Sequence, residues 1–226
     1  MENNEKEEYI SSYISKLLRK KFGKGPQNCR TTVTKNHLVT YIRGFLTPME
    51  EILLQQGQQK YVDQARTVII NHLLDEIKGV VQVTFEVEVE EQYHDWNFPN
   101  NSGIIILVLE QEITPAIKTD IDVRSLELEI ERISLLVEKI PDRIFLYPIS
   151  SSIYLIERIG ILVQIEKALI ENGFHTELLF TKDELEKRYF HRDGRFETIF
   201  KNPVRDIFVD WNLKKDKSMM AFIVRS

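Results

Sequence analysis

The sequence predicts an α+β fold that is a tandem repeat of two α-β-β-α-β-β units, each a mainly antiparallel sheet packed against helices. The triplet Asp-Trp-Asn occurs twice and contains both tryptophans of the 226 residues. From Gly44 to Asp95 is 51 residues, and from Gly160 to Asp210 is 50. Matching anchors with the same element order between them indicate two diverged copies of one unit.

The boundaries of the two units follow from the same comparison. We expect the first unit over residues 1–112, a linker over 113–122 and the second, diverged unit over 123–226. The linker segment reads ITPAIKTDID, and the second half then begins again with a helical pattern. GFLTPME at 44–50 and GILVQIE at 160–166 share Gly, Leu and Glu in register.

The first unit opens with a helix and a β-hairpin. Apolar residues recur at helical steps, namely Tyr9, Ile10, Tyr13, Ile14, Leu17 and Leu18. The glycines and proline of GKGP at 23–26 end that helix. CRTTV and LVTYIRG, with a polar turn between them, predict the hairpin.

A second helix is predicted after the hairpin. Thr47 and Glu50 have the spacing of a capping box, and Pro48 occupies the first helical position. Gly57 interrupts or bends this helix, and Gly79 is expected to end it.

The segment VQVTFEVEVE then alternates apolar and polar residues, which predicts a strand over 81–90 with one buried face. Its polar face would carry Glu86, Glu88 and Glu90. Two interpretations stay open: an acidic contact surface, or solvated side chains that discourage edge pairing. The next strand, IIILVLE, is apolar on both faces and is expected to be central.

The second unit is predicted to follow the same order. A helix over 126–137 ends before Pro141, and RIFLYPI and SIYLIERIG form a hairpin. Gly173 is expected to split the next helical region, where the first copy stays helical to Gly79. Thr181 and Glu184 predict a capping box that opens a further helix. The strands IFVDW and MMAFIVR complete the unit.

The repeated triplets are expected where the third strand of each unit enters its hairpin turn. One interpretation is structural, since Asp and Asn bond nearby backbone and Trp covers the end of the core. The other is a rim that contacts a ligand or a partner. The candidate surface consists of Asp95, Trp96, Asn97, Asp210, Trp211 and Asn212, together with the three glutamates of the predicted strand.

Residue chemistry predicts neither a catalytic site, nor a cofactor, nor a metal site. Phosphate loops, HExxH, cysteine clusters and GxSxG are all missing from the sequence. His94 and Asp95 are adjacent in a strand and would point to opposite faces. The single cysteine, Cys29, has no nearby base in sequence, and it fits a reducing compartment.

Charge and hydropathy restrict the partners. The net charge of −5 argues against nucleic acid. The N-terminal segment MENNEKEEYISS is not a secretory signal, and the longest apolar run, 104–109, is far shorter than a bilayer span. We therefore expect no transmembrane segment and a cytoplasmic protein.

The order of an N-terminal amphipathic helix, GKGP, a hairpin ending in RGFLTPMEEIL, a long helix and VQVTFEVEVE resembles the bacterial MpsC family, over residues 5 to 112. The second half lacks GKGP and has Gln164 where Pro48 stands. The resemblance implies a non-catalytic accessory or regulatory protein of a membrane-potential-generating system, associated with cation translocation and inorganic-carbon uptake. Its implied partners are subunits of that membrane complex, at the inner face of the membrane.

Two further matters stay open. The duplicated unit allows a homodimer or an intramolecular pseudo-dimer. The alternative function is a small-ligand sensor or an enzyme of unrecognised type, with a site between the two repeats lined by Trp96, Trp211 and His94.

Overall fold

The computed structural model describes residues 2–225 and divides into two compact units, one up to Ala116 and one from Ile117. The elements of the first are α1 (Asn3–Phe22), β1 (Asn28–Thr34), β2 (His37–Arg43), α2 (Pro48–Gln55), α3 (Gln59–Phe85), β3 (Val89–Asn97) and β4 (Ser102–Leu109).

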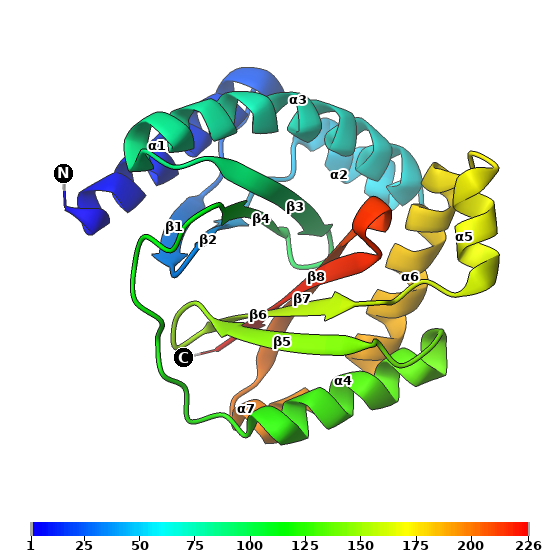
Figure 1. The fold of residues 1–226 in the computed structure, drawn as a ribbon. Coiled ribbons are helices and arrows are strands. Elements are labelled where there is room, and N and C mark those ends of the chain that lie inside the picture. Colours follow the sequence, from blue (N-terminus) through cyan, green and yellow to red (C-terminus); the bar gives the residue numbers. More distant parts are fainter. Residues whose placement is uncertain (1, 226) are drawn as a thin grey trace. The chain divides into compact units, whose positions relative to one another are not determined.

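The first unit is a four-stranded antiparallel sheet with helices on one face. The strand order is β1-β2-β4-β3, so β4 is central, as its apolar sequence predicts. Helices α1 and α3 lie along the same face of the sheet (Figure 1). The core between them includes Ile14 of α1, Ile70 of α3 and Leu107 of β4. Side chains of α1 also hydrogen-bond to the edge strand: Ser11 Oγ accepts from Thr31 N.

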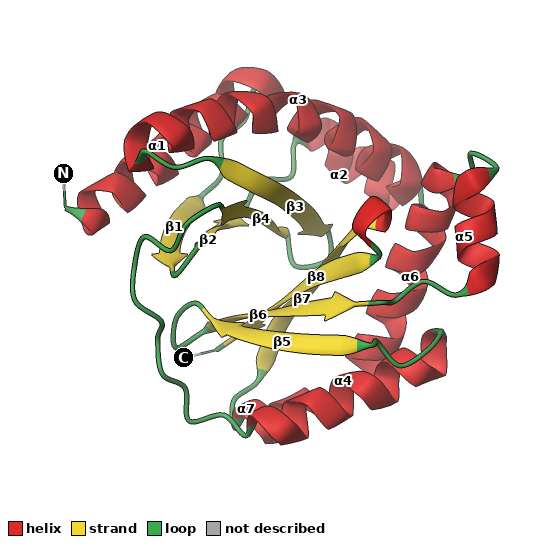
Figure 2. Cartoon of the chain, viewed as in Figure 1, coloured by secondary structure: helices red, strands yellow, loops and turns green. Residues whose placement is uncertain are grey.

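The second unit repeats this architecture. Its elements are α4 (Val123–Val137), β5 (Arg143–Pro148), β6 (Ile153–Ile159), α5 (Gln164–Glu171), α6 (His175–Asp193), α7 (Phe196–Phe200), β7 (Val204–Asn212), the short 3₁₀ helix η1 (Leu213–Lys215) and β8 (Lys217–Val224). The antiparallel order β5-β6-β8-β7 matches that of the first unit. Figure 2 shows the added elements of the second unit as well: α7 before β7, and η1 between β7 and β8.

Small irregularities are repeated as well. The third strand of each unit contains a register shift, between Val89 and Glu91 in β3 and between Val204 and Asp206 in β7. The shifts stand at the same distance before the Asp-Trp-Asn triplets. The α+β tandem architecture predicted from the sequence is therefore confirmed, and the repeat extends to details that no packing of generic helices and strands requires. The division into 1–112, the linker 113–122 and 123–226 stays a proposal.

The local signals around α2 are confirmed. Glu50 N donates to Thr47 Oγ1 at 3.3 Å, and Thr47 N donates to Glu50 Oε2 at 2.8 Å, which is a complete capping box. Gly57 adopts a left-handed conformation with φ +70° and separates α2 from α3.

The prediction of a strand over 81–90 was wrong. Helix α3 does not end at Gly79 and continues to Phe85, and β3 begins only at Val89. Val81 and Phe85 continue the buried stripe of α3 that runs from Val62. Val83, which a strand would have buried, is 83% exposed on the outer face of the helix.

Two predictions for the helices of the second unit were also wrong. Gly173 does not distinguish the copies, because it has φ +87° at the position that Gly57 occupies in the first unit. The difference lies at Gly194, where the counterpart of α3 divides into α6 and α7. Thr181 opens no helix: it lies inside α6, and its hydroxyl donates to the carbonyl of Glu177 at 2.8 Å.

Candidate functional site

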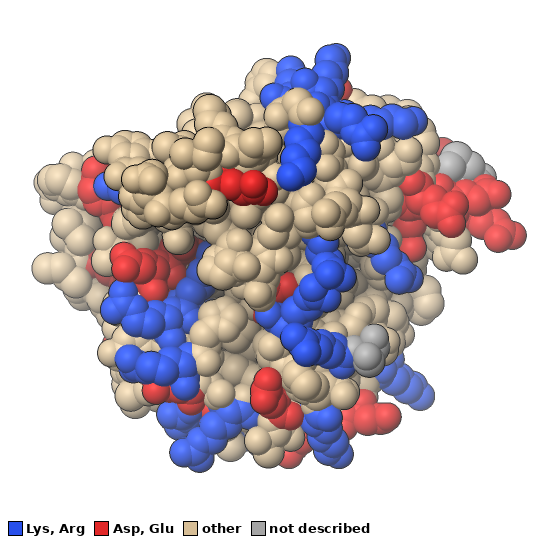
Figure 3. All heavy atoms as spheres, turned by 180° about the vertical axis from the view of Figure 1, so that it is seen from behind, with Lys and Arg blue, Asp and Glu red and all other residues tan. Residues whose placement is uncertain are grey.

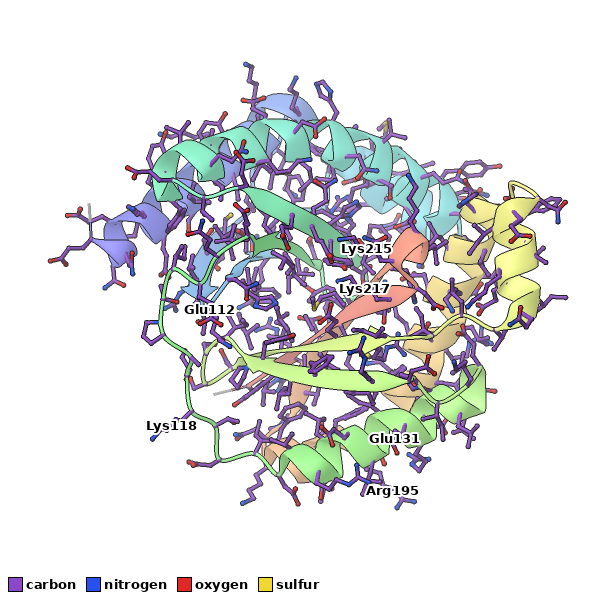
Figure 4. All side chains as sticks on the ribbon, viewed as in Figure 1. Glu112, Lys118, Glu131, Arg195, Lys215 and Lys217 are labelled. Atoms are coloured by element: carbon purple, nitrogen blue, oxygen red, sulfur yellow. The ribbon has the colours of Figure 1, made fainter. Side chains whose placement is uncertain are left out.

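The two Asp-Trp-Asn triplets end β3 and β7 and make the same backbone hydrogen bonds. Asp95 Oδ1 accepts from Trp96 N at 2.6 Å, and Asp210 Oδ1 accepts from Trp211 N at 2.7 Å. Asn97 Oδ1 accepts from Asn100 N, and Asn212 Oδ1 accepts from Lys215 N. Lys215 and Lys217 mark the second turn in Figure 4. The Asp and Asn side chains therefore shape both turns.

Each turn is hydrogen-bonded to the segment that leads from the second strand of its unit into the following helix, α2 or α5. Asn101 (φ +47°) accepts with Oδ1 from the N–H groups of Phe45 and Leu46, at 2.6 and 2.8 Å. Its carbonyl accepts from Gly44 N.

Asp216 (φ +51°) makes the same three bonds in the second unit, to Ile161 N, Leu162 N and Gly160 N. Unlike Asn101, Asp216 carries a negative charge, and its Oδ2 forms an ion pair with Lys167 Nζ at 3.0 Å. Burial opposes ionisation of Asp216, but its hydrogen bonds to the backbone and to Lys167 together lower its pKa. These bonds position the start of α2 and of α5.

A buried ion pair lies beneath the turn of the first unit. Arg66 of α3 donates from Nε and Nη2 to the Glu50 carboxylate, at 2.9 and 2.6 Å. The guanidinium lies 4.5 Å from the ring centroid of Trp96 and 4.8 Å from that of Phe45. Trp96 is itself only 3% exposed, and a Cβ on Gly103 would come 2.0 Å from its ring.

The second unit keeps the ion pair with different residues. Glu166 Oε2 accepts from Val163 N at 2.9 Å, which preserves half of the capping box although Thr47 is replaced by Val163. The other oxygen of Glu166 accepts from Lys182 Nζ, also at 2.9 Å. Lys182 occupies on α6 the position of Arg66 on α3. Both units therefore bury a cation against the carboxylate that caps the preceding helix.

Three more charged residues enlarge this pair in the second unit. Arg158 of β6 and Glu186 of α6 stand where the first unit has Ile42 and Ile70, and Glu138 caps the end of α4. Arg158 Nη2 donates to Glu186 Oε2 at 2.5 Å, and Trp211 Nε1 donates to Glu186 Oε1 at 2.9 Å. We name Glu138, Arg158, Glu166, Lys182 and Glu186 the buried charge cluster.

The electrostatics of the buried charge cluster follow from its low exposure. Burial opposes ionisation of Glu186, but the charges of Arg158 and Lys182 and its hydrogen bonds lower its pKa. Burial likewise opposes the charge on Lys182, and the carboxylates of Glu186 and Glu138 raise its pKa. Glu186 and Lys182 are therefore both charged at neutral pH.

These buried charges differ from those at the surface. On the face shown in Figure 3, Lys and Arg are interspersed with Asp and Glu. No group of three or more His, Cys, Asp or Glu within residues 2–225 is placed to hold a metal ion. Burial raises the pKa of the Cys29 thiol to about 12, so this thiol is protonated at neutral pH.

The predicted acidic surface does not share one strand. Glu86 caps the end of α3 with φ +59°, Glu88 lies between α3 and β3, and Glu90 lies in β3. All three are exposed. Their alternation in the sequence therefore reflects three different local structures, and their role as a contact surface stays a prediction, as does that of the Asp-Trp-Asn residues.

Sequence reasoning missed the buried charges. Arg66 lies between Val62 and Ile70 in the buried stripe of α3, and Lys182 and Glu186 lie between Leu178 and Phe190 in that of α6. A charge at a position where helical spacing demands an apolar residue was the available signal, because such a residue needs a buried partner.

The fold and the site define a class: a tandem α+β protein in which each unit buries an ion pair beneath an Asp-Trp-Asn turn. No helix within the described residues 2–225 has both the length and the apolar character needed to cross a membrane. Residues 2–111 match the family described as Na+-translocating membrane potential-generating system (MpsC). The first unit of the chain therefore belongs to the MpsC family. No curated protein and no solved structure matches the chain.

Proposed function

We propose that the chain is a non-catalytic accessory or regulatory protein that binds subunits of a membrane-potential-generating system at the inner face of the membrane. The observation that carries the proposal is the family match, which extends over almost the whole first unit. The family description names a membrane system, and a chain of this kind would act on that system through a protein contact.

The repeat suggests an equivalent exposed position on each unit for this contact. Met49 and Ile165 follow the first residue of α2 and α5, at equivalent positions of the two units, and each is 70% exposed. Ile52 on α2 is exposed as well. Folding does not require a large apolar side chain at an exposed position, and two diverged copies have retained one there. Exposed apolar side chains next to polar ones are a common feature of protein contacts.

The proposal predicts a loss of capture when these side chains are made acidic. Tagged wild-type chain should co-purify the ion-translocating subunits from membranes of the source cell. Met49→Glu with Ile165→Glu should lower that capture about tenfold or more, because a carboxylate buried in an apolar contact costs several kcal/mol. Mass spectrometry of the captured subunits measures the change.

Matched variants separate contact from folding. Met49→Leu with Ile165→Val keeps the surface apolar and should capture like wild type. Circular dichroism and thermal melting should show all three proteins folded, since both positions are exposed. Absence of the membrane subunits from the wild-type sample would overturn the proposal and favour the small-ligand alternative.

A further inference from the structure

The buried charge cluster has an odd number of charges. With every group ionised, three carboxylates (Glu138, Glu166 and Glu186) face two cations (Arg158 and Lys182). The first unit balances one carboxylate with one cation at the corresponding place. A buried charge without a partner is costly, and a group in that position ordinarily gives up its charge instead. One carboxylate of the cluster is therefore in excess.

The contacts identify which carboxylate is in excess. Glu186 is held by Arg158, by Trp211 and, at 3.6 Å, by Lys182. Glu166 is held by Lys182 and by the backbone of α5. Within the described residues, the structure gives the Glu138 carboxylate a single hydrogen-bond partner, Lys182 Nζ.

Solvent access distinguishes Glu138 as well. Its side chain is 15% exposed, against 8% for Glu166 and 3% for Glu186. A proton from water therefore reaches Glu138 most readily.

Among the described residues, the other groups around the cluster bring no second cation within ion-pair distance of Glu138. Asp183 of α6 pairs with Lys187 at 2.6 Å, and burial raises the pKa of Asp183 against the effect of Lys187. Ser134 of α4 and Ser218 of β8 accept hydrogen bonds from Arg158 and carry no charge. Asp210 of β7 is a further carboxylate, which accepts from Trp211 N, and Lys167 of α5 pairs with Asp216.

We propose that Glu138 is a proton-binding site of the second unit, which takes up one proton to balance the buried charge cluster. When ionised, Glu138 ties the end of α4 to Lys182 on α6 by a charge-assisted hydrogen bond. When protonated, Glu138 offers Lys182 only a neutral carboxyl oxygen, so the ion pair between the two helices is lost and Lys182 keeps ionised partners only in Glu166 and Glu186. The proton thus controls how firmly α4 is held against α6.

The pKa of Glu138 is raised, as proton binding at this site requires. Burial and the carboxylate of Glu186 raise it to about 7, against the opposing effect of Lys182. A carboxyl whose folded pKa lies above its unfolded value binds more protons in the folded state. The contribution of Glu138 to the free energy of unfolding is therefore largest below the unfolded pKa of about 4.5. This contribution declines as the pH rises to about 7. Above that pH the decline is complete.

Carbon-13 NMR of the full chain labelled at its glutamate carboxyl carbons tests the site directly. Over about pH 5 to about pH 9, where ordinary glutamates are already ionised, one resonance should titrate with a midpoint near 7. Glu138→Gln should remove it. Glu131→Gln, on the same helix α4 and labelled in Figure 4, should leave it in place.

A second variant and a second readout complete the test. Glu138→Asp removes the residue from the labelled set, so the resonance must disappear whether or not Gln is tolerated there. Trp211 fluorescence in a Trp96→Phe background should follow the same midpoint, because Trp211 donates to Glu186 of the cluster. A chain with no glutamate resonance titrating near pH 7, or one that persists in both Glu138 variants, overturns the proposal.

Discussion

Replacing Arg66 with methionine should lower the free energy of unfolding of the first unit by about 3–5 kcal/mol, because it leaves Glu50 buried without its partner. Burial lowers the pKa of the guanidinium, and Glu50 opposes that effect, so the two charges depend on one another. Urea denaturation followed by Trp96 fluorescence, in a Trp211→Phe background, measures the loss, since Trp96 packs on Arg66.

Two further variants show whether the loss of stability comes from the unpaired charge of Glu50. Lys78→Met breaks an exposed ion pair with Asp75 on the same helix, and it should cost less than about 1 kcal/mol. Adding Glu50→Gln to Arg66→Met removes the unpaired charge and should recover a large part of the loss, since Gln can still accept from Thr47 N. A cost for Arg66→Met as small as that of Lys78→Met would show that the pair is not buried as described.

Replacing Glu186 with isoleucine should destabilise the second unit by a similar amount, about 3–5 kcal/mol. The change leaves Arg158 buried without its carboxylate and removes the acceptor of the Trp211 indole N–H. Denaturation followed by Trp211 fluorescence in a Trp96→Phe background measures it. Glu184→Ile on the same helix, from an exposed pair with Arg188, is the control and should cost little.

The first unit supplies the decisive double variant. It has isoleucine at both equivalent positions, Ile42 and Ile70, and both are fully buried. Arg158→Ile combined with Glu186→Ile should therefore recover most of the stability that Glu186→Ile loses, because no charge then remains unpaired between β6 and α6. If the double variant is less stable than the single one, the cluster is not an elaboration of the simple pair seen in the first unit.

Local signals in the sequence predicted the parts of the fold that neighbouring residues determine. The capping box of Thr47 and Glu50, the hairpins and the central place of β4 all follow from chemistry within a few residues. The repeat itself was predictable because Gly44 and Gly160, with their left-handed backbones, had to be kept in both copies.

The end of α3 was not predictable from periodicity. Val81, Phe85 and Val89 recur every fourth residue, and that spacing fits both a strand of period two and a helix of period 3.6. Packing of Val81 and Phe85 against the sheet decides for the helix. The motif at Thr181 failed for a similar reason, because Leu178 and Phe190 hold α6 in register on both sides of it.

The buried charges needed the structure. Arg158, Lys182 and Glu138 come from a strand and two helices that are far apart in sequence, and only the fold brings them together. Within the sequence, Arg158 and Glu138 look like ordinary surface charges, and only Lys182 stands at a position where helical spacing predicts an apolar residue. The family resemblance identified the first unit, but the cluster lies in the second unit, beyond residue 111 where the match ends.

Membrane potential, measured with a voltage-sensitive dye in source cells that lack this chain, tests the proposed function most directly. Cells without the chain should be depolarised in the same direction as cells that lack the ion-translocating subunit. Wild-type chain should restore the potential, and Met49→Glu with Ile165→Glu should not. An unchanged potential in cells without the chain, under conditions in which loss of the ion-translocating subunit depolarises them, would contradict the assignment to this membrane system.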